Sequence, residues 1–334
     1  MLPRRSITAL PIAALLGAAA LAKPRRASAL AAQPAPLAKP EALTLGYQKV
    51  GHLAPFALVE ADLGPLGVNL RMVEFARYAD ARTALISGSL DLATVGPADL
   101  AIALAQGATD IVGLTGVGSS EKYVIGRNGV TLDSWNDLRG KKIAIAPGSA
   151  VWFQFAATLT EKGIPYNSFT AVNIQGGGAN FDQALKRGEV DAIVTWEPFE
   201  SIPVIEGYGF FARNLEYSRS RAVGAELGML VATQTAARAK KDAVDRFIWA
   251  YAKAQRALSD DPARFAEAYA RFTGLELNVA REAAKPITLG GVVTPEQIAA
   301  QARAFHQLGV VPRDVSAEIP KHWDAGFVAR ANGA

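Results

Sequence analysis

The sequence contains no cysteine. This absence excludes disulfides, zinc sites with thiolate ligands, iron–sulfur clusters, cysteine nucleophiles and lipid attachment at an N-terminal cysteine. Histidine is also scarce, since His52, His306 and His322 are the only three in 334 residues. We therefore expect no metal site built on several histidines and no cofactor.

Motifs that would indicate nucleotide binding or hydrolysis are missing as well. Gly140-Lys141-Lys142 lacks the upstream glycine and the following hydroxyl of a phosphate-binding loop. The glycines at 176–178 do not complete a dinucleotide fingerprint, because position 181 is Phe181. Neither a G-x-S-x-G nor an H-E-x-x-H motif occurs. We therefore name no catalytic residue, although an extracytoplasmic enzyme without these motifs stays an open alternative.

The formal net charge of +4 comes from the beginning of the chain. Residues 1–31 contain five basic residues and no acid. The thirty Lys and Arg that remain face 31 acids, for a net charge of −1. A chain that is nearly neutral beyond residue 31 has no extended positive surface for phosphates, which argues against nucleic acid as a partner.

Residues 1–31 have the organisation of an export signal. Arg4 and Arg5 precede an apolar run over 7–22 that is shorter than the roughly 20 residues of a membrane-spanning helix. Small residues before Ala22, Ala29 and Ala31 suit signal peptidase, so cleavage after any of the three is possible. An uncleaved anchor is the alternative, and the Arg pair leaves Sec and twin-arginine export both open.

Beyond an Ala/Pro linker at 32–42, short apolar runs alternate with helical segments. Strands separated by helices of this length predict βαβ units and a parallel sheet. Two α/β blocks are expected at about 43–125 and 128–222, followed by a mostly helical region from about 236. The expected strands are 43–47, 68–75, 90–95, 111–114, 143–146, 169–174, 192–195 and 208–212, and a further apolar run at 227–232 precedes the helical region.

Several expected turns between a strand and a helix are rich in small residues. In α/β sheets such turns lie at the carboxyl ends of the strands, where ligands bind, and helix N-termini favour anions there. One such turn is ordinary, but five in two facing blocks predict a binding cleft. The five turns are 74–80, 96–99, 146–150, 175–180 and 195–199.

The order and spacing of several short motifs resemble the periplasmic substrate-binding proteins of ABC importers in the nitrate, sulfonate and taurine group, which includes binders of thiamine-pyrimidine precursors. The matching pieces are Leu45-Gly-Tyr-Gln-Lys49, Ala84-Leu-Ile-Ser-Gly-Ser-Leu-Asp91, Asp137-Leu-Arg-Gly-Lys-Lys-Ile-Ala144, Pro147-Gly-Ser149, Arg187-Gly-Glu-Val-Asp191 and Trp196-Glu-Pro-Phe199.

This resemblance implies a type II periplasmic binding protein, with two doubly wound α/β lobes joined by two crossing segments and a helical C-terminal region. The crossings would be 121–127 and about 226–232. Lobe I would then be 43–123 together with 226–334, and lobe II would be 124–225. Because the lobes would meet only through these crossings and a cleft, we expect a small, wet interface with Gly126 and Gly224 near the hinge.

The resemblance also places ligand contacts between the lobes. It implies the positions Gln48, His52, Tyr78, Asp80, Gly96, Pro97, Ser119, Ser120, Ser149, Ala150, Gln175, Trp196 and Glu197. Other roles are open for three of them: His52 as a solvated loop residue, Trp196 as lobe core, and Glu197 as a first-turn residue that complements a helix dipole. No arginine lies plainly in the turns, and Arg77 is the nearest candidate.

The function implied is that of an exported, monomeric solute-binding protein in the periplasm. It would capture a small organic oxyanion or zwitterion, sulfonate- or taurine-like, and deliver it to an ABC permease with a separate ATPase subunit. A pyrimidine or an aromatic carboxylate is the alternative ligand, and an enzyme on the same fold is the alternative function. No stable membrane insertion of the mature chain is expected.

Overall fold

The computed structural model describes residues 29–290 and 293–333. The predicted signal segment up to residue 28, including the possible cleavage site after Ala22, lies outside these residues. In the part of the chain that is described, no helix combines the length and the apolar character that crossing a bilayer requires.

The fold has two β-sheets. The first is a six-stranded mixed sheet with the strand order β11-β4-β10-β3-β1-β2. β1 is parallel to β2 and β3, whereas β10 is antiparallel to β3 and β4, and β11 is antiparallel to β4. The strands are β1 Glu41–Tyr47, β2 Val68–Glu74, β3 Leu92–Val95, β4 Val112–Ser120, β10 Glu226–Ala232 and β11 Ile287–Leu289.

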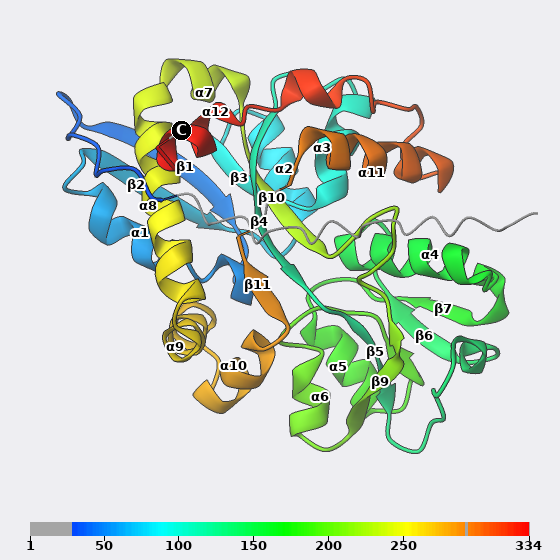
Figure 1. Cartoon of the computed structure of the whole chain (residues 1–334). Coiled ribbons are helices and arrows are strands. Elements are labelled where there is room, and N and C mark those ends of the chain that lie inside the picture. Colours follow the sequence, from blue (N-terminus) through cyan, green and yellow to red (C-terminus); the bar gives the residue numbers. More distant parts are fainter. Residues whose placement is uncertain (1–28, 291–292, 334) are drawn as a thin grey trace, which may run out of the picture.

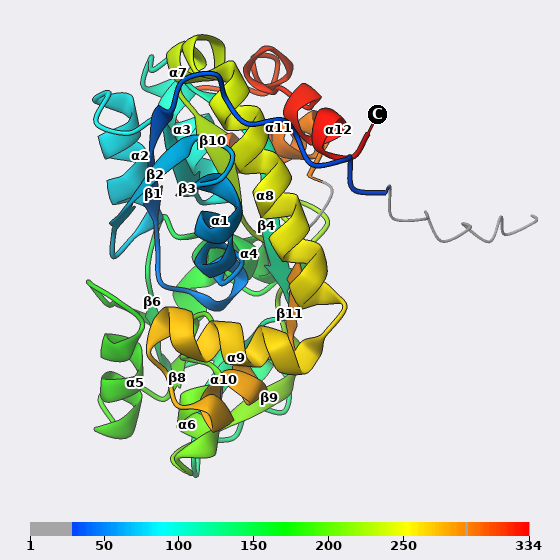
Figure 2. The ribbon, with the colours of Figure 1, turned by 90° about the vertical axis from the view of Figure 1, so that its left-hand side faces the viewer.

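Helices cover both faces of this sheet (Figures 1 and 2). α1 and α8 pack with one apolar cluster, and α2, α3 and α11 pack with a second one. α9 and α10 extend below the end of α8. The helices are α1 Phe56–Leu63, α2 Tyr78–Ile86, α3 Pro97–Ala105, α7 Gln234–Ala239, α8 Lys241–Ser259, α9 Pro262–Thr273, α10 Leu277–Ala284, α11 Pro295–Gln307 and α12 Gly326–Ala331.

The second sheet is a five-stranded mixed sheet with the strand order β7-β6-β8-β5-β9. β6 is parallel to β7 and β8, and β5 is antiparallel to β8 and β9. The elements are β5 Tyr123–Arg127, β6 Lys142–Ile145, β7 Thr170–Asn173, β8 Ala192–Ile193, β9 Gly209–Glu216, α4 Ala150–Lys162, α5 Ala179–Lys186 and α6 Ser201–Ile205. We call the six-stranded sheet with its helices lobe I, and residues 123–216 lobe II.

The predicted parallel pairing holds for β1 with β2 and β3 and for β6 with β7 and β8, but each sheet also contains antiparallel strands, for a topological reason. β4 runs on into β5, and β9 leads back to β10, so the strands beside the passages between lobes run against their neighbours. The region after residue 236 is mostly helical, as predicted, and β11 is a strand of three residues within it. Asn180 is a residue type that often caps helices, yet it lies inside α5, whose N-cap is Gly178.

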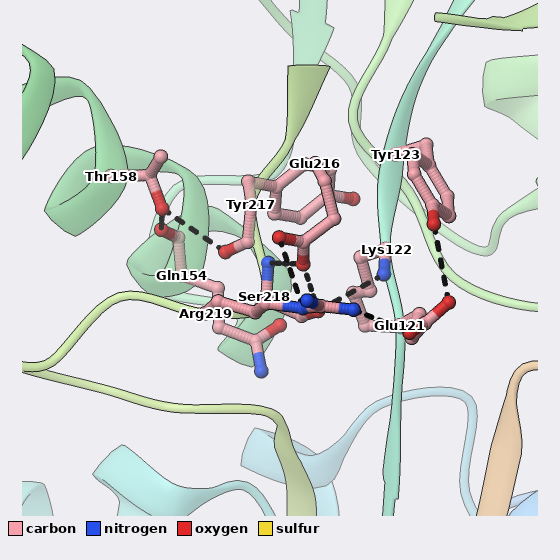
Figure 3. Close-up of polar contacts among 9 residues, drawn as sticks. All are labelled: Glu121, Lys122, Tyr123, Gln154, Thr158, Glu216, Tyr217, Ser218 and Arg219. Atoms are coloured by element: carbon pink, nitrogen blue, oxygen red, sulfur yellow. Dashed lines mark hydrogen bonds and ion pairs between the residues drawn. The ribbon is translucent and has the colours of Figure 1, made fainter. Parts of the chain in front are cut away.

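Two passages connect the lobes, 121–122 and 217–225. They lie side by side: the Tyr217 amide donates to the Lys122 carbonyl at 2.9 Å, and Arg219 pairs with Glu121 at 2.7 Å (Figure 3). The expected second crossing at 226–232 is wrong, because those residues form β10 within the six-stranded sheet. The expected domain boundaries stay a prediction.

The two glycines expected at a hinge have different roles. Gly224 lies in the second passage with φ +76°, a conformation that suits glycine. Gly126 lies within β5, where a Cβ atom would be 2.6 Å from the ring of Phe210. Its function is therefore close packing against β9.

Candidate ligand-binding cleft

A cavity of about 180 Å³ lies between the lobes at the strand-to-helix turns. Lobe I contributes the loop after β1 and the turns into α2 and α3, while lobe II contributes the turns into α4 and α5 together with Trp196. Eight of the sequence-predicted ligand positions line this cavity. They are Gln48, His52, Tyr78, Gly96, Ser149, Ala150, Gln175 and Trp196.

The other five predicted positions lie elsewhere. Asp80 is in the first turn of α2 and pairs with Arg77, and Pro97 is buried between two lining residues of α3. Ser119 and Ser120 are paired in β4, between β10 and β11. The sequence can indicate where a strand ends, but it does not show which side of the sheet each residue near that end faces.

Glu197 faces away from this cavity, although its neighbour Trp196 lines it. Its carboxylate accepts from the Ser201 hydroxyl at 2.9 Å and from the Ser201 amide at 3.2 Å, at the start of α6. Burial is the main cause that raises the pKa of Glu197 to about 7. This geometry corresponds to the alternative of a first-turn residue.

Glu197 instead helps to line a second cavity of about 200 Å³. That cavity lies between lobe II and the end of α10, and Glu200 and Lys285 also line it. Lys122 and Glu200 are fully buried, and Lys122 Nζ has no hydrogen-bond partner among the described residues. Burial lowers the pKa of Lys122 and raises that of Glu200.

The lobe I wall of the ligand-binding cleft is a fixed polar surface. Gln48 Oε1 accepts from Thr94 Oγ1 at 2.7 Å, which positions the amide. His52 Nε2 and the Tyr78 hydroxyl are 2.6 Å apart. Burial, and secondarily the charge of Lys122, lowers the pKa of His52 to about 3, so the imidazole is neutral and can accept from Tyr78.

Asp99 and Arg77 line the cleft, and each is paired with a side chain that does not line it. Asp99 pairs with Arg82 and accepts from the Gly96 amide at 2.7 Å. Arg77 lines the cleft, is exposed, and lies 3.0 Å from Asp80. The sequence analysis named Arg77 only as the arginine nearest to the predicted turns. In the structure, Arg77 is the cation that lines the cleft.

Helix N-termini add further positive potential. α2 begins at Tyr78 and α4 at Ala150, and both residues line the cleft. Ser149 Oγ accepts from the Trp152 amide, as predicted for an N-cap. Within the described residues, the amides of Ala150 and Val151 have no protein acceptor. These free donors can bind an oxyanion.

The lobe II wall is largely apolar. Trp196 packs edge-on against Phe181 and Phe199, with ring centroids 5.9 and 6.0 Å away. Four further apolar residues line the cleft, and the sequence analysis named none of them as a ligand contact. They are Val50, Val151, Ile174 and Leu227. Val151 and Ile174 lie beside predicted turns and Val50 lies in the loop after β1, whereas Leu227 comes from β10 and had no sequence signal.

Three comparisons with known proteins agree with this geometry. The chain is 26% identical over 171 residues to an Escherichia coli (strain K12) protein whose name describes it as binding aliphatic sulfonates, covering 50% of this chain and 53% of the relative. It is 28% identical over 159 residues to the taurine-binding periplasmic protein of the same organism, covering 47% and 48%. The chain thus spans about half the length of the curated relatives it matches.

A solved structure extends the likeness to the whole fold. The alkanesulfonate-binding protein of Xanthomonas axonopodis pv. citri, bound to MOPS, matches with a TM-score of 0.70 at 23% identity, over 86% of this chain and 99% of that one. The two chains therefore share the same overall fold. The NMT1/THI5-like family model matches residues 66–265, more than half of the chain. The chain therefore belongs to the NMT1/THI5-like family and has the fold of periplasmic binding proteins.

Proposed function

We propose that this protein binds a small aliphatic sulfonate in the cleft between its lobes and delivers it to an ABC importer. The observation that carries the proposal is the convergence of Arg77, the N-terminus of α2 and the free first-turn amides of α4 on one cavity. A sulfonate presents three oxygens with one charge, which suits several backbone donors and one guanidinium.

The rest of the cleft favours an uncharged tail on that anion. Trp196, Val151 and Leu227 offer apolar contact area. The one carboxylate that lines the cleft, Asp99, already serves Arg82 and the Gly96 amide. An ammonium group such as that of taurine would find no unpaired carboxylate in this wall, and burying an unpaired charge is costly.

The test is titration calorimetry with a matched pair of ligands. In 1-propanesulfonate a methyl group replaces the ammonium of taurine, and butyrate replaces the sulfonate by a carboxylate. We expect 1-propanesulfonate to bind at least tenfold more tightly than taurine or butyrate. Tighter binding of taurine would contradict the apolar-tail assignment, and no binding of any sulfonate would contradict the proposed function. If the ligand is still intact after prolonged incubation with the protein, the protein binds it without converting it.

Trp196→Ala should weaken 1-propanesulfonate binding by roughly 10- to 100-fold, because a cleft aromatic contributes about 1–3 kcal/mol. Calorimetry measures the affinity and thermal unfolding the stability. Phe199→Ala is the matched control, since Phe199 contacts Trp196 but does not line the cleft. Unchanged affinity with lowered stability in Trp196→Ala would mean that Trp196 is only lobe core.

The same function implies export to the periplasm, an ABC permease and its ATPase as partners, and action as a monomer. We expect removal of a signal peptide after Ala22 or Ala29 rather than after Ala31. The Ala31 amide donates to the Ala331 carbonyl at 2.9 Å, and the Trp249 indole donates to the Ala31 carbonyl at 3.0 Å. Cleavage after Ala31 would remove both bonds.

N-terminal sequencing of the protein secreted by its native host checks this processing. A mature chain that begins at Lys23 or Leu30 is expected. A mature chain that begins at Ala32 would show that the contacts of Ala31 are dispensable. A chain that retains Met1 would show that the segment is not a cleaved signal.

A further inference from the structure

α4 is shared between the two lobes. It belongs to lobe II in the chain, and Phe155 on one of its sides packs in the lobe II core and against Tyr217 of the second passage, with ring centroids 5.7 Å apart. Phe153 and Ala157 on another side lie in an apolar cluster of lobe I. The Phe153 and Phe305 ring centroids are 4.4 Å apart, and both side chains are fully buried. The expectation of a small, wet interface is therefore wrong along α4.

Figure 1 shows α4 lying between the five-stranded sheet and α11. α4 is also bonded to the second passage and to the start of β10: Gln154 Nε2 donates to the carbonyl of Gly224 at 3.0 Å and to that of Glu226 at 3.1 Å. Thr158 Oγ1 donates to the Tyr217 carbonyl at 3.1 Å (Figure 3). A rigid rotation of lobe II away from lobe I would have to break the aromatic contact or detach α4 from its own lobe.

The same helix supplies part of the ligand-binding cleft. Ser149, Ala150 and Val151 line the cavity, and Phe153 follows Val151 by two residues. Phe153 itself does not line the cavity. Its packing against α11 therefore fixes how far the α4 N-terminus lies from the lobe I wall of the cleft.

We propose that Phe153 and Phe305 form a positioning contact that holds the lobes at the separation in which the cleft is assembled. Ligand affinity then depends on two residues that do not touch the ligand. When the assembled arrangement is only a fraction of the population, the apparent Kd rises by the inverse of that fraction. The part of the proposal that concerns affinity rests on the proposed function, whereas the part that concerns lobe separation does not.

The experiment measures the distance between the lobes directly. The chain has no cysteine, so spin labels can be placed at Ser87→Cys in lobe I and Arg187→Cys in lobe II, both exposed positions, without background labelling. Pulsed electron–electron double resonance then gives the distance distribution of the labelled protein. Phe153→Ala and Phe305→Ala should each shift and broaden this distribution without ligand, and should weaken 1-propanesulfonate binding at least tenfold.

Phe155→Ala is the matched control, because it removes the same side chain from the same helix on the side of the lobe II core. It should lower the melting temperature and leave the distance distribution as in the parent protein. Phe153→Leu, which keeps apolar volume at the contact, should restore most of both properties and serves if the alanine variant does not fold.

Unchanged distances in Phe153→Ala and Phe305→Ala would overturn the proposal, even if affinity fell. A shifted distance with unchanged Kd would overturn its affinity part. If the distances shift as expected and no sulfonate binds even the parent protein, the proposed function fails and the positioning contact stands.

Discussion

Ala150→Asp should reduce 1-propanesulfonate binding by more than about 100-fold without lowering the stability of the fold. Ala150 is the first residue of α4 and lines the cleft. Two like charges about 4 Å apart repel by roughly 4 kcal/mol at the effective dielectric of a protein surface. A carboxylate in the first turn of a helix stabilises that helix by about 0.3–1 kcal/mol. Binding and stability should therefore change in opposite directions.

Ala150→Asn is the control for this prediction, because the asparagine side chain has nearly the same shape as that of aspartate but carries no charge. We expect it to weaken binding much less than Ala150→Asp. Calorimetry gives both affinities, and thermal unfolding gives both stabilities. Equal losses in the two variants would mean that space at the α4 N-terminus matters rather than charge, and the cleft would then not be a site for an anion.

The alternation of strands and helices made most of the fold predictable, since buried strands and amphipathic helices differ in apolar period. Gly163, in the left-handed conformation, ends α4, as glycine commonly does after the last turn of a helix. The antiparallel pairing of β10 was not predictable in the same way. An apolar run such as 226–232 shows that a strand is buried, but it does not show which neighbour the strand meets or in which direction.

The cleft was predictable as a set of turns but not as a set of side chains. Trp196 and Glu197 are adjacent in the sequence. Only the path of the chain into α6 determines that Trp196 lines the cleft, whereas Glu197 accepts a hydrogen bond from Ser201. The double packing of α4 was hidden for a related reason. Phe153 and Phe155 are both apolar and buried, and the sequence does not tell which lobe each one enters.

A large effect of pH on stability should come from Asp182 in α5. Its side chain is buried, and Oδ1 has no hydrogen-bond partner among the described residues. Burial is the main cause that raises the pKa of this carboxyl from 3.8 to about 8, and the charges of Glu206 and Glu197 add to it. Lys186, the nearby cation, already pairs with Glu206 at 2.8 Å.

The sign of the effect follows from proton binding. Between pH 3.8 and about 8 the folded protein keeps the Asp182 proton and the unfolded chain has lost it, so stability falls as the pH rises through this window. Asp182→Asn stays neutral at every pH. Because each pKa unit corresponds to about 1.4 kcal/mol, its stability relative to the parent should rise by several kcal/mol between pH 4 and pH 8.

Urea unfolding of both proteins at several pH values gives this difference. The difference is needed because His52, whose folded pKa is lowered to about 3, acts in the opposite direction and makes the fold more stable as the pH rises towards 6.5. That contribution is common to both proteins and cancels. Asp245→Asn changes a carboxylate that is already paired with Lys241 and Arg330, so it should bring no such gain at pH 8. A stability difference between Asp182→Asn and the parent that stays constant from pH 4 to pH 8 would show that Asp182 ionises normally in the folded protein.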